Sequence, residues 1–255
     1  MNSPSLLIIG CGDLGLRAGT ALADEGWRVD AARRTPDGQT SLFNWYAADY
    51  SDPESLRFVE GLKPDFILAT LSPTSRDWPG YETGFPGAAQ AILDGLGQHR
   101  AQRLIMTSST RVYQEANGGW VDEHAALSTT DERAVAIIEA ERLFLQSDQP
   151  TSIVRLAGIY GTPGGRLVSR IARGEIAPAE PTRYTNRIHR EDCGGFLVHL
   201  LNAAARKEAL ADVYNGVDDM PAPAFEVESW IAKQLGVQPS NHLSLIHISE
   251  PTRHI

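Results

Sequence analysis

Three glycines near the start of the chain, Gly10, Gly12 and Gly15, have the spacing G-x-G-x-x-G and directly follow the apolar run Leu6 to Ile9. The run is typical of a buried strand, and Leu14 to Glu25 can form the helix that follows it. In this setting the glycines serve a tight turn, close approach of the backbone to a pyrophosphate, and close helix–strand packing. The free N–H groups at the helix start would bind the pyrophosphate. The pattern therefore favours a dinucleotide site over an ordinary glycine-rich turn.

The end of the second predicted strand bears on which dinucleotide binds. An acidic residue there accepts from the ribose 2′-OH of NAD, whereas arginine accommodates the 2′-phosphate of NADP. Arg33 and Arg34 stand at this end, and guanidinium groups bind phosphate through forked, charge-assisted hydrogen bonds. Asp30 follows Gly10 by about 20 residues, as the ribose acid often does, but we place it in mid-strand, too early to reach the ribose. NADP is favoured, and NAD stays open because the two arginines could simply be solvated.

Composition limits the partners that the protein can have. A chain of 255 residues suits one large α/β domain, or a nucleotide-binding domain with a small second lobe. The formal charge of −9 argues against nucleic acid or an anionic membrane as the main partner. We see no secretion signal, no apolar run of membrane-spanning length, and no metal-ligand spacing around Cys11 or Cys193. We therefore expect a cytoplasmic protein with a small-molecule substrate, and the sequence does not predict its oligomeric state.

Strand and helix patterns alternate along the chain, which predicts an α/β fold with a doubly wound parallel sheet. After the first unit we expect strands at Phe43–Ala47, Phe66–Leu71, Arg103–Thr107 and Thr151–Leu156. We expect helices at 53–61, 86–98, 131–146, 193–205 and 226–235, and a polar loop at 72–86. Residues 1–158 would form the nucleotide-binding domain, with 192–206 packing back on it. Residues 159–191 and 207–242 would form a small substrate lobe.

The last residues differ in kind from the rest of the chain. Leu243 to Arg253 match the translation of a transposase adapter used in DNA library preparation, and the match is continuous. Leu243, Leu245 and Ile248 could also form one face of a strand, but chance identity over this length is a poor explanation. We therefore expect residues 243–255 to be adapter read-through, with the native C-terminal elements missing.

Six motifs occur in a fixed order. They are Gly10-x-Gly12-x-x-Gly15, the pair Asp49/Asp52, the segments 107–113 and 155–161, the run Arg187-Ile188-His189-Arg190-Glu191-Asp192, and Val213-Tyr214-Asn215. Together they resemble the extended short-chain dehydrogenase/reductase superfamily, of the NAD-dependent epimerase/dehydratase type, over about residues 5 to 238.

The resemblance implies a Rossmann fold and a set of cofactor contacts. It implies that Asp49 lies near the adenine, that two strand ends face the ribose and nicotinamide, and that 156–159 lie beside the nicotinamide. The expected cofactor-binding residues are Gly10, Gly12, Asp13, Leu14, Gly15, Arg33, Arg34, Asp49, Leu71, Ser72, Thr107, Ser108, Leu156 and Gly158.

The chain departs from the family in its catalytic pair. Active members typically carry Tyr-x-x-x-Lys on the helix after the fifth strand, where the lysine lowers the tyrosine pKa so that the phenol can exchange a proton near neutral pH. None of the three lysines here has a tyrosine four residues before it. Arg133 stands roughly where the tyrosine would fall, and an arginine does not release its proton in this range.

Other side chains could still take part in chemistry. Ser109 best matches the catalytic serine or threonine of the family, Thr110 lies beside it, and Tyr113 is the nearest phenol. Arg155 and Arg187 could bind an anionic substrate or form ion pairs.

His189 has a useful titration range, but its place before Glu191-Asp192 favours a structural role as a helix N-cap. Two functions follow from the whole pattern. The first is an NADP-dependent oxidoreductase or epimerase/dehydratase-like enzyme acting on a sugar nucleotide or another small carbonyl or hydroxyl compound. The second is a non-catalytic, NADP-binding redox sensor or regulatory protein.

Overall fold

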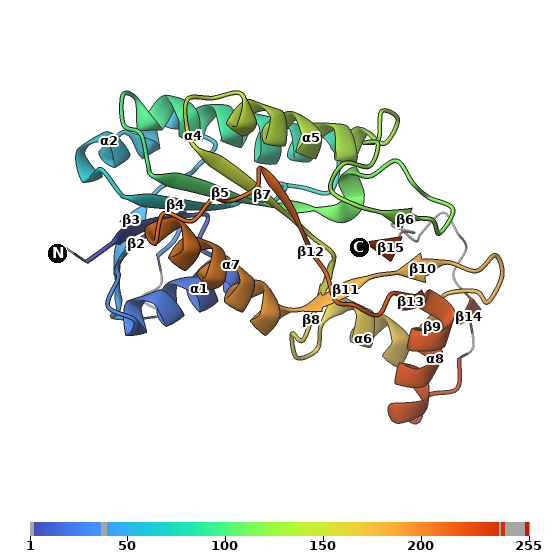
Figure 1. Ribbon diagram of the computed structural model, residues 1–255. Coiled ribbons are helices and arrows are strands. Elements are labelled where there is room, and N and C mark those ends of the chain that lie inside the picture. The colour runs from blue at the N-terminus through green and yellow to red at the C-terminus, as the bar shows by residue number, and fades with distance from the viewer. Residues whose placement is uncertain (1–2, 37–39, 240, 243–252, 255) are drawn as a thin grey trace.

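A seven-stranded parallel sheet forms the centre of the protein in the computed structural model, which describes residues 3–36, 40–239, 241–242 and 253–254 (Figure 1). The strand order is β12-β7-β5-β4-β1-β2-β3. Their bounds are β1 Ser5–Ile9, β2 Arg28–Arg33, β3 Phe43–Ala47, β4 Phe66–Thr70, β5 Arg103–Ser109, β7 Thr151–Leu156 and β12 Val213–Gly216. The order reverses next to β1, which confirms the predicted doubly wound α/β sheet.

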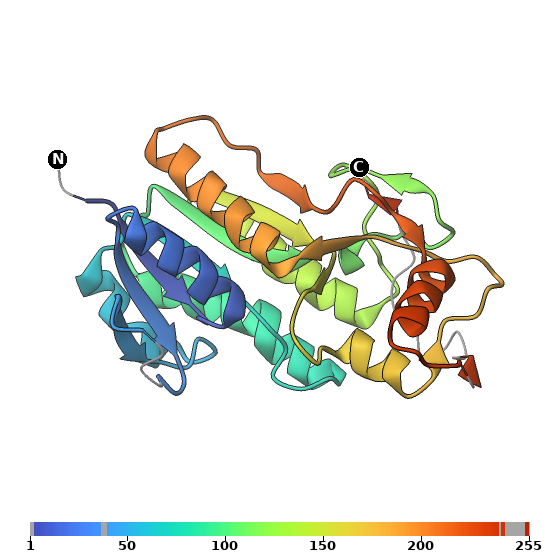
Figure 2. The same ribbon diagram turned by 90° about the horizontal axis from the view of Figure 1, so that it is seen from below.

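Helices cover both faces of the sheet. Helices α1 (Asp13–Asp24) and α7 (Arg190–Ala205) lie side by side on one face, as Figures 1 and 2 show. Helices α2 (Phe58–Leu62), α4 (Ala88–Leu96) and α5 (Glu132–Leu145) cover the other face. The segment 192–206 therefore packs against the nucleotide-binding part of the chain, because α7 contacts α1.

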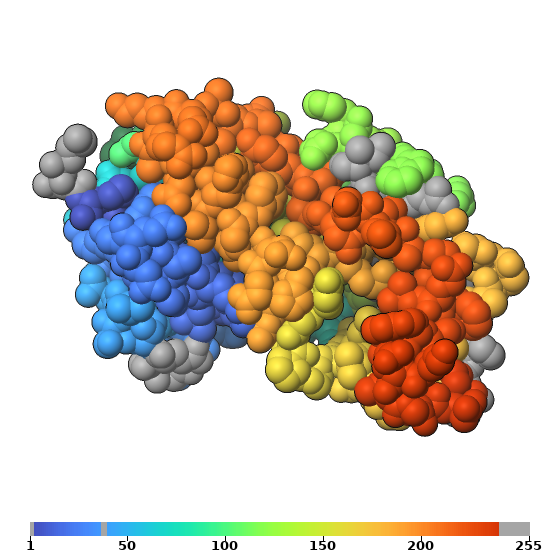
Figure 3. All heavy atoms as spheres, turned by 60° about the horizontal axis from the view of Figure 1, so that its bottom comes forward, coloured from blue at the N-terminus to red at the C-terminus, as the bar shows by residue number. Residues whose placement is uncertain are grey.

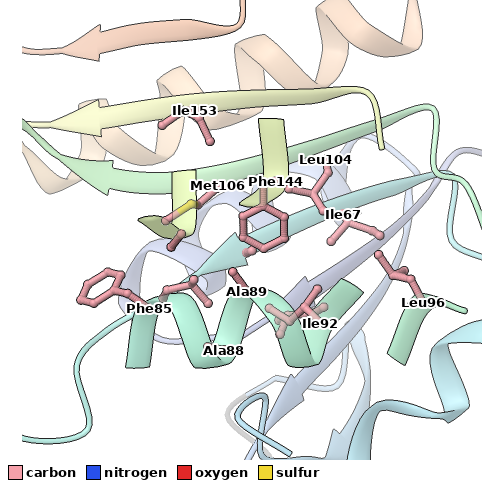
Figure 4. Packing of buried hydrophobic residues seen from close by; sticks show 14 of the residues in the cluster. Ile67, Phe85, Ala88, Ala89, Ile92, Leu96, Leu104, Met106, Phe144 and Ile153 are labelled. Atoms are coloured by element: carbon pink, nitrogen blue, oxygen red, sulfur yellow. The ribbon is translucent and has the colours of Figure 1, made fainter. Parts of the chain in front are cut away.

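The alternation of side chains along each strand divides the apolar core into two layers. In β1, Leu7 and Ile9 belong to the layer under α4 and α5, whereas Leu6 and Ile8 belong to the layer under α1 and α7. All five residues of β1 are buried, as expected for a central parallel strand. Figure 4 shows the first layer, in which Phe144 of α5 packs with Ile92 and neighbouring residues of α4 against the sheet.

The segment 72–86, predicted as a loop, contains helical structure. Helix α3 spans Trp78–Glu82, and a π-helical turn spans Thr83–Gly87. The carboxylate of Asp77 caps α3 by accepting from the N–H of Gly80 at 3.1 Å, and Pro79 occupies the first turn, where it removes no hydrogen bond. The predicted helix at 86–98 accordingly begins later, at Ala88.

The rest of the chain forms smaller elements beside the sheet. Helices α6 and α8 span Arg166–Ala172 and Ala224–Gln234, and two 3-10 turns span Pro53–Leu56 and Thr110–Val112. The short strands are β6 Trp120–Val121, β8 Gly158–Tyr160, β9 Glu175–Ile176, β10 Tyr184–Thr185, β11 Arg187–His189, β13 Ala222–Pro223, β14 Asn241–His242 and β15 Arg253–His254.

One C-terminal segment departs from the expected division into lobes. Val213–Gly216, expected in the small lobe, pair with β7 as the edge strand β12 of the main sheet. The division into two lobes otherwise stays a prediction. We expect residues 243–255 to be adapter read-through. Apart from the two residues of β15, this segment lies outside the residues that the structure describes. Across the described ranges, none of the helices is both long and apolar enough to span a membrane.

Candidate active site

A cleft opens at the carboxyl ends of β1, β4, β5 and β7, where ligands bind in open α/β sheets. Its volume is about 310 Å³, near the lower end of the range for small-molecule pockets. It is lined by Gly10, Gly12, Asp13, Leu14, Thr70, Leu71, Ser72, Phe85, Thr107, Ser108, Ser109, Leu156 and Ile159. In Figure 3 the surface is hollowed between orange and yellow segments, and teal atoms show at the floor.

The three glycines of the motif have three different surroundings. Gly10 has a φ of +78°, and a Cβ there would lie 2.6 Å from the carbonyl oxygen of Thr70, so the turn requires glycine. A Cβ on Gly15 would lie 2.8 Å from the side chain of Ile8, so this glycine permits close helix–strand packing. A Cβ on Gly12 would meet nothing closer than the Gly10 carbonyl oxygen at 3.8 Å. The free space at Gly12 is therefore on the side from which a ligand approaches.

The start of α1 fits a pyrophosphate. Gly12 is the N-cap residue and has no side chain to satisfy the first N–H groups of the helix. These groups carry the positive end of the helix dipole, and they border the open space at Gly12. The glycine turn and the helix start together could therefore hold the phosphates of a dinucleotide.

Asp30 lies within β2, as the sequence predicts, and its carboxylate contacts two neighbouring side chains. It accepts from the side-chain N–H of Asn44 at 3.0 Å and pairs with Arg28 at 3.3 Å. The side chain is only 1% exposed. The carbonyl oxygen of Ala32, two residues later, accepts from the N–H groups of Gly10 and Cys11 and ties the strand end to the glycine turn. Asp30 is thus displaced from the strand end where a ribose acid would stand.

Basic residues stand at this strand end instead. Burial raises the pKa of the Cys11 thiol to about 12, and the charge of Arg33 offsets part of this increase, which places Arg33 beside the glycine turn. Hydrogen bonds from Ser51 lower the pKa of Asp49, and the charge of exposed Arg34 adds to this effect. The expected adenosine-binding residues therefore lie near one another.

Two of the expected catalytic hydroxyls differ in their placement. Ser109 lines the cleft, and its Oγ accepts from the N–H of Arg111 at 3.2 Å; within the described part of the chain its own proton has no acceptor, so it can reach a ligand. Thr110 is 2% exposed and is not among the described residues that line the cleft. Next to Ser109, Ser108 also lines the cleft, and its hydroxyl donates to the buried carboxylate of Glu141.

Tyr113, the expected phenol, belongs to a buried polar network. Its hydroxyl donates to Asn215 Oδ1 at 2.6 Å and accepts from Arg155 at 3.2 Å. Arg155 also forms a bidentate pair with Glu141, at 2.7 and 3.1 Å. Burial raises the pKa of Tyr113, and the nearby Arg155 compensates only in part. The phenol does not line the cleft within the described part of the chain, and its surroundings hold it neutral.

Helix α5 has neither the tyrosine nor the lysine of the family pair. Arg133, at the expected tyrosine position, is exposed and lies 5.5 Å from the centre of the Tyr81 ring. Ile137, one turn later, is buried. Among the described residues that line the cleft, Asp13 alone has an ionisable side chain. The cleft therefore offers hydroxyl groups for proton transfer in place of a phenol.

The remaining candidates have distinct roles. Of the two roles that the sequence left open for Arg155, the structure shows the ion pair, which the arginine forms with buried Glu141. Arg187 is partly buried, and burial lowers its pKa although Asp218 and Glu228 oppose this effect. His189 is the N-cap of α7, and its Nδ1 accepts from the N–H of Glu191 at 3.3 Å, as the sequence predicts.

Glu141 is a buried charged residue of this network that the sequence analysis does not single out. The available signal was an acidic residue at an otherwise apolar position of a helix, together with an arginine in an apolar strand. Buried charges of this kind need a partner.

Comparison with known proteins shows the family to which the chain belongs. Residues 10–204 match the family described as NAD(P)H-binding, which is more than half of the chain. The chain belongs to the NAD(P)H-binding family. It is also 30% identical over 249 residues to Protein YeeZ of Escherichia coli strain K12, an alignment covering 91% of this chain and 84% of YeeZ.

Solved structures show the same fold in other proteins. UDP-glucuronic acid 4-epimerase from Bacillus cereus, in complex with UDP-glucuronic acid and NAD, superposes with a TM-score of 0.80 at 19% identity, covering 96% of this chain and 88% of that one. MoeE5 in complex with UDP-glucose and NAD gives 0.78 at 24% identity, covering 98% and 88%. The family match and the shared fold are consistent with the predicted resemblance to extended short-chain dehydrogenases. This member of the NAD(P)H-binding family lacks the Tyr-x-x-x-Lys pair.

Proposed function

We propose that the protein is an NADP-dependent oxidoreductase or epimerase/dehydratase-like enzyme that acts on a small carbonyl or hydroxyl compound. The preference for NADP over NAD is supported by the residues at the end of β2. The acidic residue of this strand, Asp30, is buried and paired with Arg28, whereas Arg33 and Arg34 stand where the adenosine ribose is expected. Two guanidinium groups favour a 2′-phosphate over a free 2′-OH.

When bound, the cofactor would supply or accept a hydride at its nicotinamide ring. The chain would contribute orientation and a hydrogen bond. Ser109, whose hydroxyl proton is free, would donate to a substrate oxygen at the end of β5. Ser108, whose proton is committed to Glu141, would offer only acceptor lone pairs. Adjacent positions would thus present a donor and an acceptor to the same ligand.

The substrate class is supported by structural neighbours and by Arg187. Two proteins of the same fold were solved with UDP-glucuronic acid and with UDP-glucose. In this chain, Arg187 of β11 lies opposite Gly158 of β8, next to the cleft residue Ile159. A partly buried guanidinium so close to the cleft suits an anionic substrate such as a sugar nucleotide.

A second function is supported by the surroundings of the expected phenol. The Tyr113 hydroxyl is bound on both sides, and the ionisable side chain found among the described cleft residues is Asp13. A protein that binds NADP without turnover, and signals its redox state to a partner, would need no proton donor. For either function we propose a cytoplasmic protein, as expected from the sequence.

Titration of the full chain with NADPH and NADH, followed by cofactor fluorescence, tests the cofactor proposal. We expect tighter binding of NADPH and a loss of about 10-fold or more in Arg33→Asp, because charge-assisted hydrogen bonds contribute about 1.5–3 kcal/mol. NADH affinity should change far less. Arg57→Asp is the control, since Arg57 is exposed and pairs with nearby Glu54. Equal binding of both cofactors by the unmodified protein would refute the preference.

Turnover separates the two functions. The enzyme proposal predicts a change in NADPH absorbance, or conversion of a UDP-sugar, with at least one compound of a carbonyl and sugar-nucleotide panel. Ser109→Ala should reduce this rate and leave the dissociation constant of NADPH within about 3-fold. Tight NADPH binding with no turnover across the panel would favour the sensor.

A further inference from the structure

Four charged side chains meet where the N-terminal ends of α1 and α7 lie together. Asp13, the first residue of α1, lines the cleft beside Gly12. Its carboxylate pairs with Arg17 at 3.1 Å and lies 3.6 Å from Arg190, the first residue of α7. Arg17 also pairs with Glu191. The cluster thus joins the two helices at the edge of the predicted phosphate site.

Asp13 places a negative charge beside the predicted phosphate site. A carboxylate in the first turn interacts well with the helix dipole when the site is empty. A pyrophosphate at the same helix start would bring negative charge close to this carboxylate, and the two like charges would repel each other, although solvent screens part of this because the Asp13 side chain is 51% exposed. A second cation beside Asp13, in addition to Arg17, would relieve this repulsion and could also serve the phosphate.

Arg190 has unused capacity for this role. Its NH1 group is 3.6 Å from Asp13, which is an ion pair but too long for a good hydrogen bond. Its Nε is buried and has no hydrogen-bond partner among the described residues. The side chain is 21% exposed, so it is held in place yet open to solvent on one side. A guanidinium has five N–H donors in a fixed plane, which suits a phosphate.

We propose that Arg190 is a cofactor-binding residue that transfers its interaction from Asp13 to the pyrophosphate when the dinucleotide binds. The inference rests on the proposed cofactor function. In the free protein Arg190 neutralises Asp13 across the contact of α1 with α7. In the complex its donors reach the phosphates, and Arg17 keeps Asp13 paired. Asp13 then acts against binding and lowers the affinity for both NADPH and NADH.

Replacing Arg190 and replacing Asp13 should change the affinity for the cofactors in opposite directions. Arg190→Gln should weaken NADPH and NADH by the same factor, about 10-fold or more, because the pyrophosphate is common to both. Asp13→Asn should tighten both by about 3-fold or more, since it removes a like charge. Arg33→Asp, in contrast, should weaken NADPH alone. Arg206→Gln, which breaks an exposed pair with Glu208 at the other end of α7, is the matched control.

The double variant Asp13→Asn/Arg190→Gln separates direct binding from simple neutralisation. If Arg190 contacts the phosphates, the double variant should bind both cofactors about 10-fold more weakly than Asp13→Asn alone. Equal affinity of the double variant and Asp13→Asn would show that Arg190 only neutralises Asp13, and would overturn the proposal. Thermal unfolding of every variant shows that the folded protein is being compared.

The same binding measurements distinguish a failure of the role of Arg190 from a failure of the proposed cofactor site. Binding by the unmodified protein, with Arg190→Gln no weaker than Arg206→Gln, would refute the role of Arg190 and leave the cofactor site standing. Failure of the unmodified protein to bind either cofactor would refute the cofactor proposal, and this inference with it. Weaker binding by Asp13→Asn would also contradict the proposed transfer.

Discussion

Replacing Glu141 by glutamine tests how strongly the buried pair with Arg155 stabilises the sheet. The two side chains are 3% and 4% exposed, and the carboxylate accepts from Arg155 at 2.7 and 3.1 Å as well as from Ser108. Glutamine keeps the shape and one acceptor oxygen. It removes the negative charge and turns an N–H₂ group toward the guanidinium, so the Arg155 charge is left buried and unpaired.

The size of the effect follows from this loss. Removing one partner of a buried ion pair typically costs about 3–5 kcal/mol of unfolding free energy. For a chain of this length each kcal/mol corresponds to about 2–4 °C in Tm, so we expect a decrease of about 6–20 °C. Glu139→Gln is a close control. It lies on the same helix and pairs with Arg142, but these side chains are 40% and 48% exposed, and such pairs contribute about 0–1 kcal/mol.

Equilibrium unfolding in urea measures both variants against the unmodified protein. The expected result is a much lower midpoint for Glu141→Gln at an unchanged m-value, with Glu139→Gln close to the unmodified protein. A loss below about 1 kcal/mol for Glu141→Gln, or an equal loss in both variants, would refute the reasoning. Arg155 would then be solvated well enough to tolerate the loss of its partner.

Two further predictions concern the glycine turn and the phenol. Gly12→Ala should lower the Tm by only a few degrees, because a Cβ there meets nothing within 3.4 Å and the cost is the poorer cap of α1, but should abolish measurable NADPH binding. Gly10→Ala should lower both Tm and affinity, since φ is +78° and the Thr70 carbonyl is 2.6 Å away. Tyr113→Phe should cost about 1–3 kcal/mol in urea unfolding at neutral pH, because two buried partners lose a hydrogen bond. Since burial raises the Tyr113 pKa above 10.0, the neutral phenol stabilises the fold below pH 10 and this contribution is lost as pH rises further, so Tyr113→Phe should flatten the alkaline decline in stability.

The first βαβ unit was predictable because all its signals are local. The apolar run of β1, the glycine turn and the helix start are adjacent in sequence, and the structure has them within a residue or two of the expected bounds. Strands β3, β4, β5 and β7 were found for the same reason. Helix α3 was missed because Pro79, Gly80 and Gly84 look like loop residues, while the signal for a helix is the single cap residue Asp77.

The polar network could not be predicted from pattern alone. The chain segments that carry Tyr113 and Asn215 are far apart in sequence, and nothing local indicates that their side chains meet. Glu141 has the spacing of a core-facing helix residue, and the sequence does not show which cation it faces. The Asp13–Arg190 contact likewise depends on the packing of α1 against α7. Local sequence thus predicts elements, whereas tertiary packing decides which charged groups become partners.

The position of β12 has a consequence for the order in which the protein assembles. Glu141 and Arg155 are 14 residues apart, whereas Tyr113 and Asn215 are 102 residues apart. As the chain leaves the ribosome, the six strands β1 to β7 of the sheet are complete before α7 and β12 exist. Until β12 arrives, β7 has an open edge with unpaired N–H and C=O groups, which can pair with another chain. The last strand therefore closes both the sheet and the network, and the nascent protein is most exposed to aggregation just before residue 213 emerges.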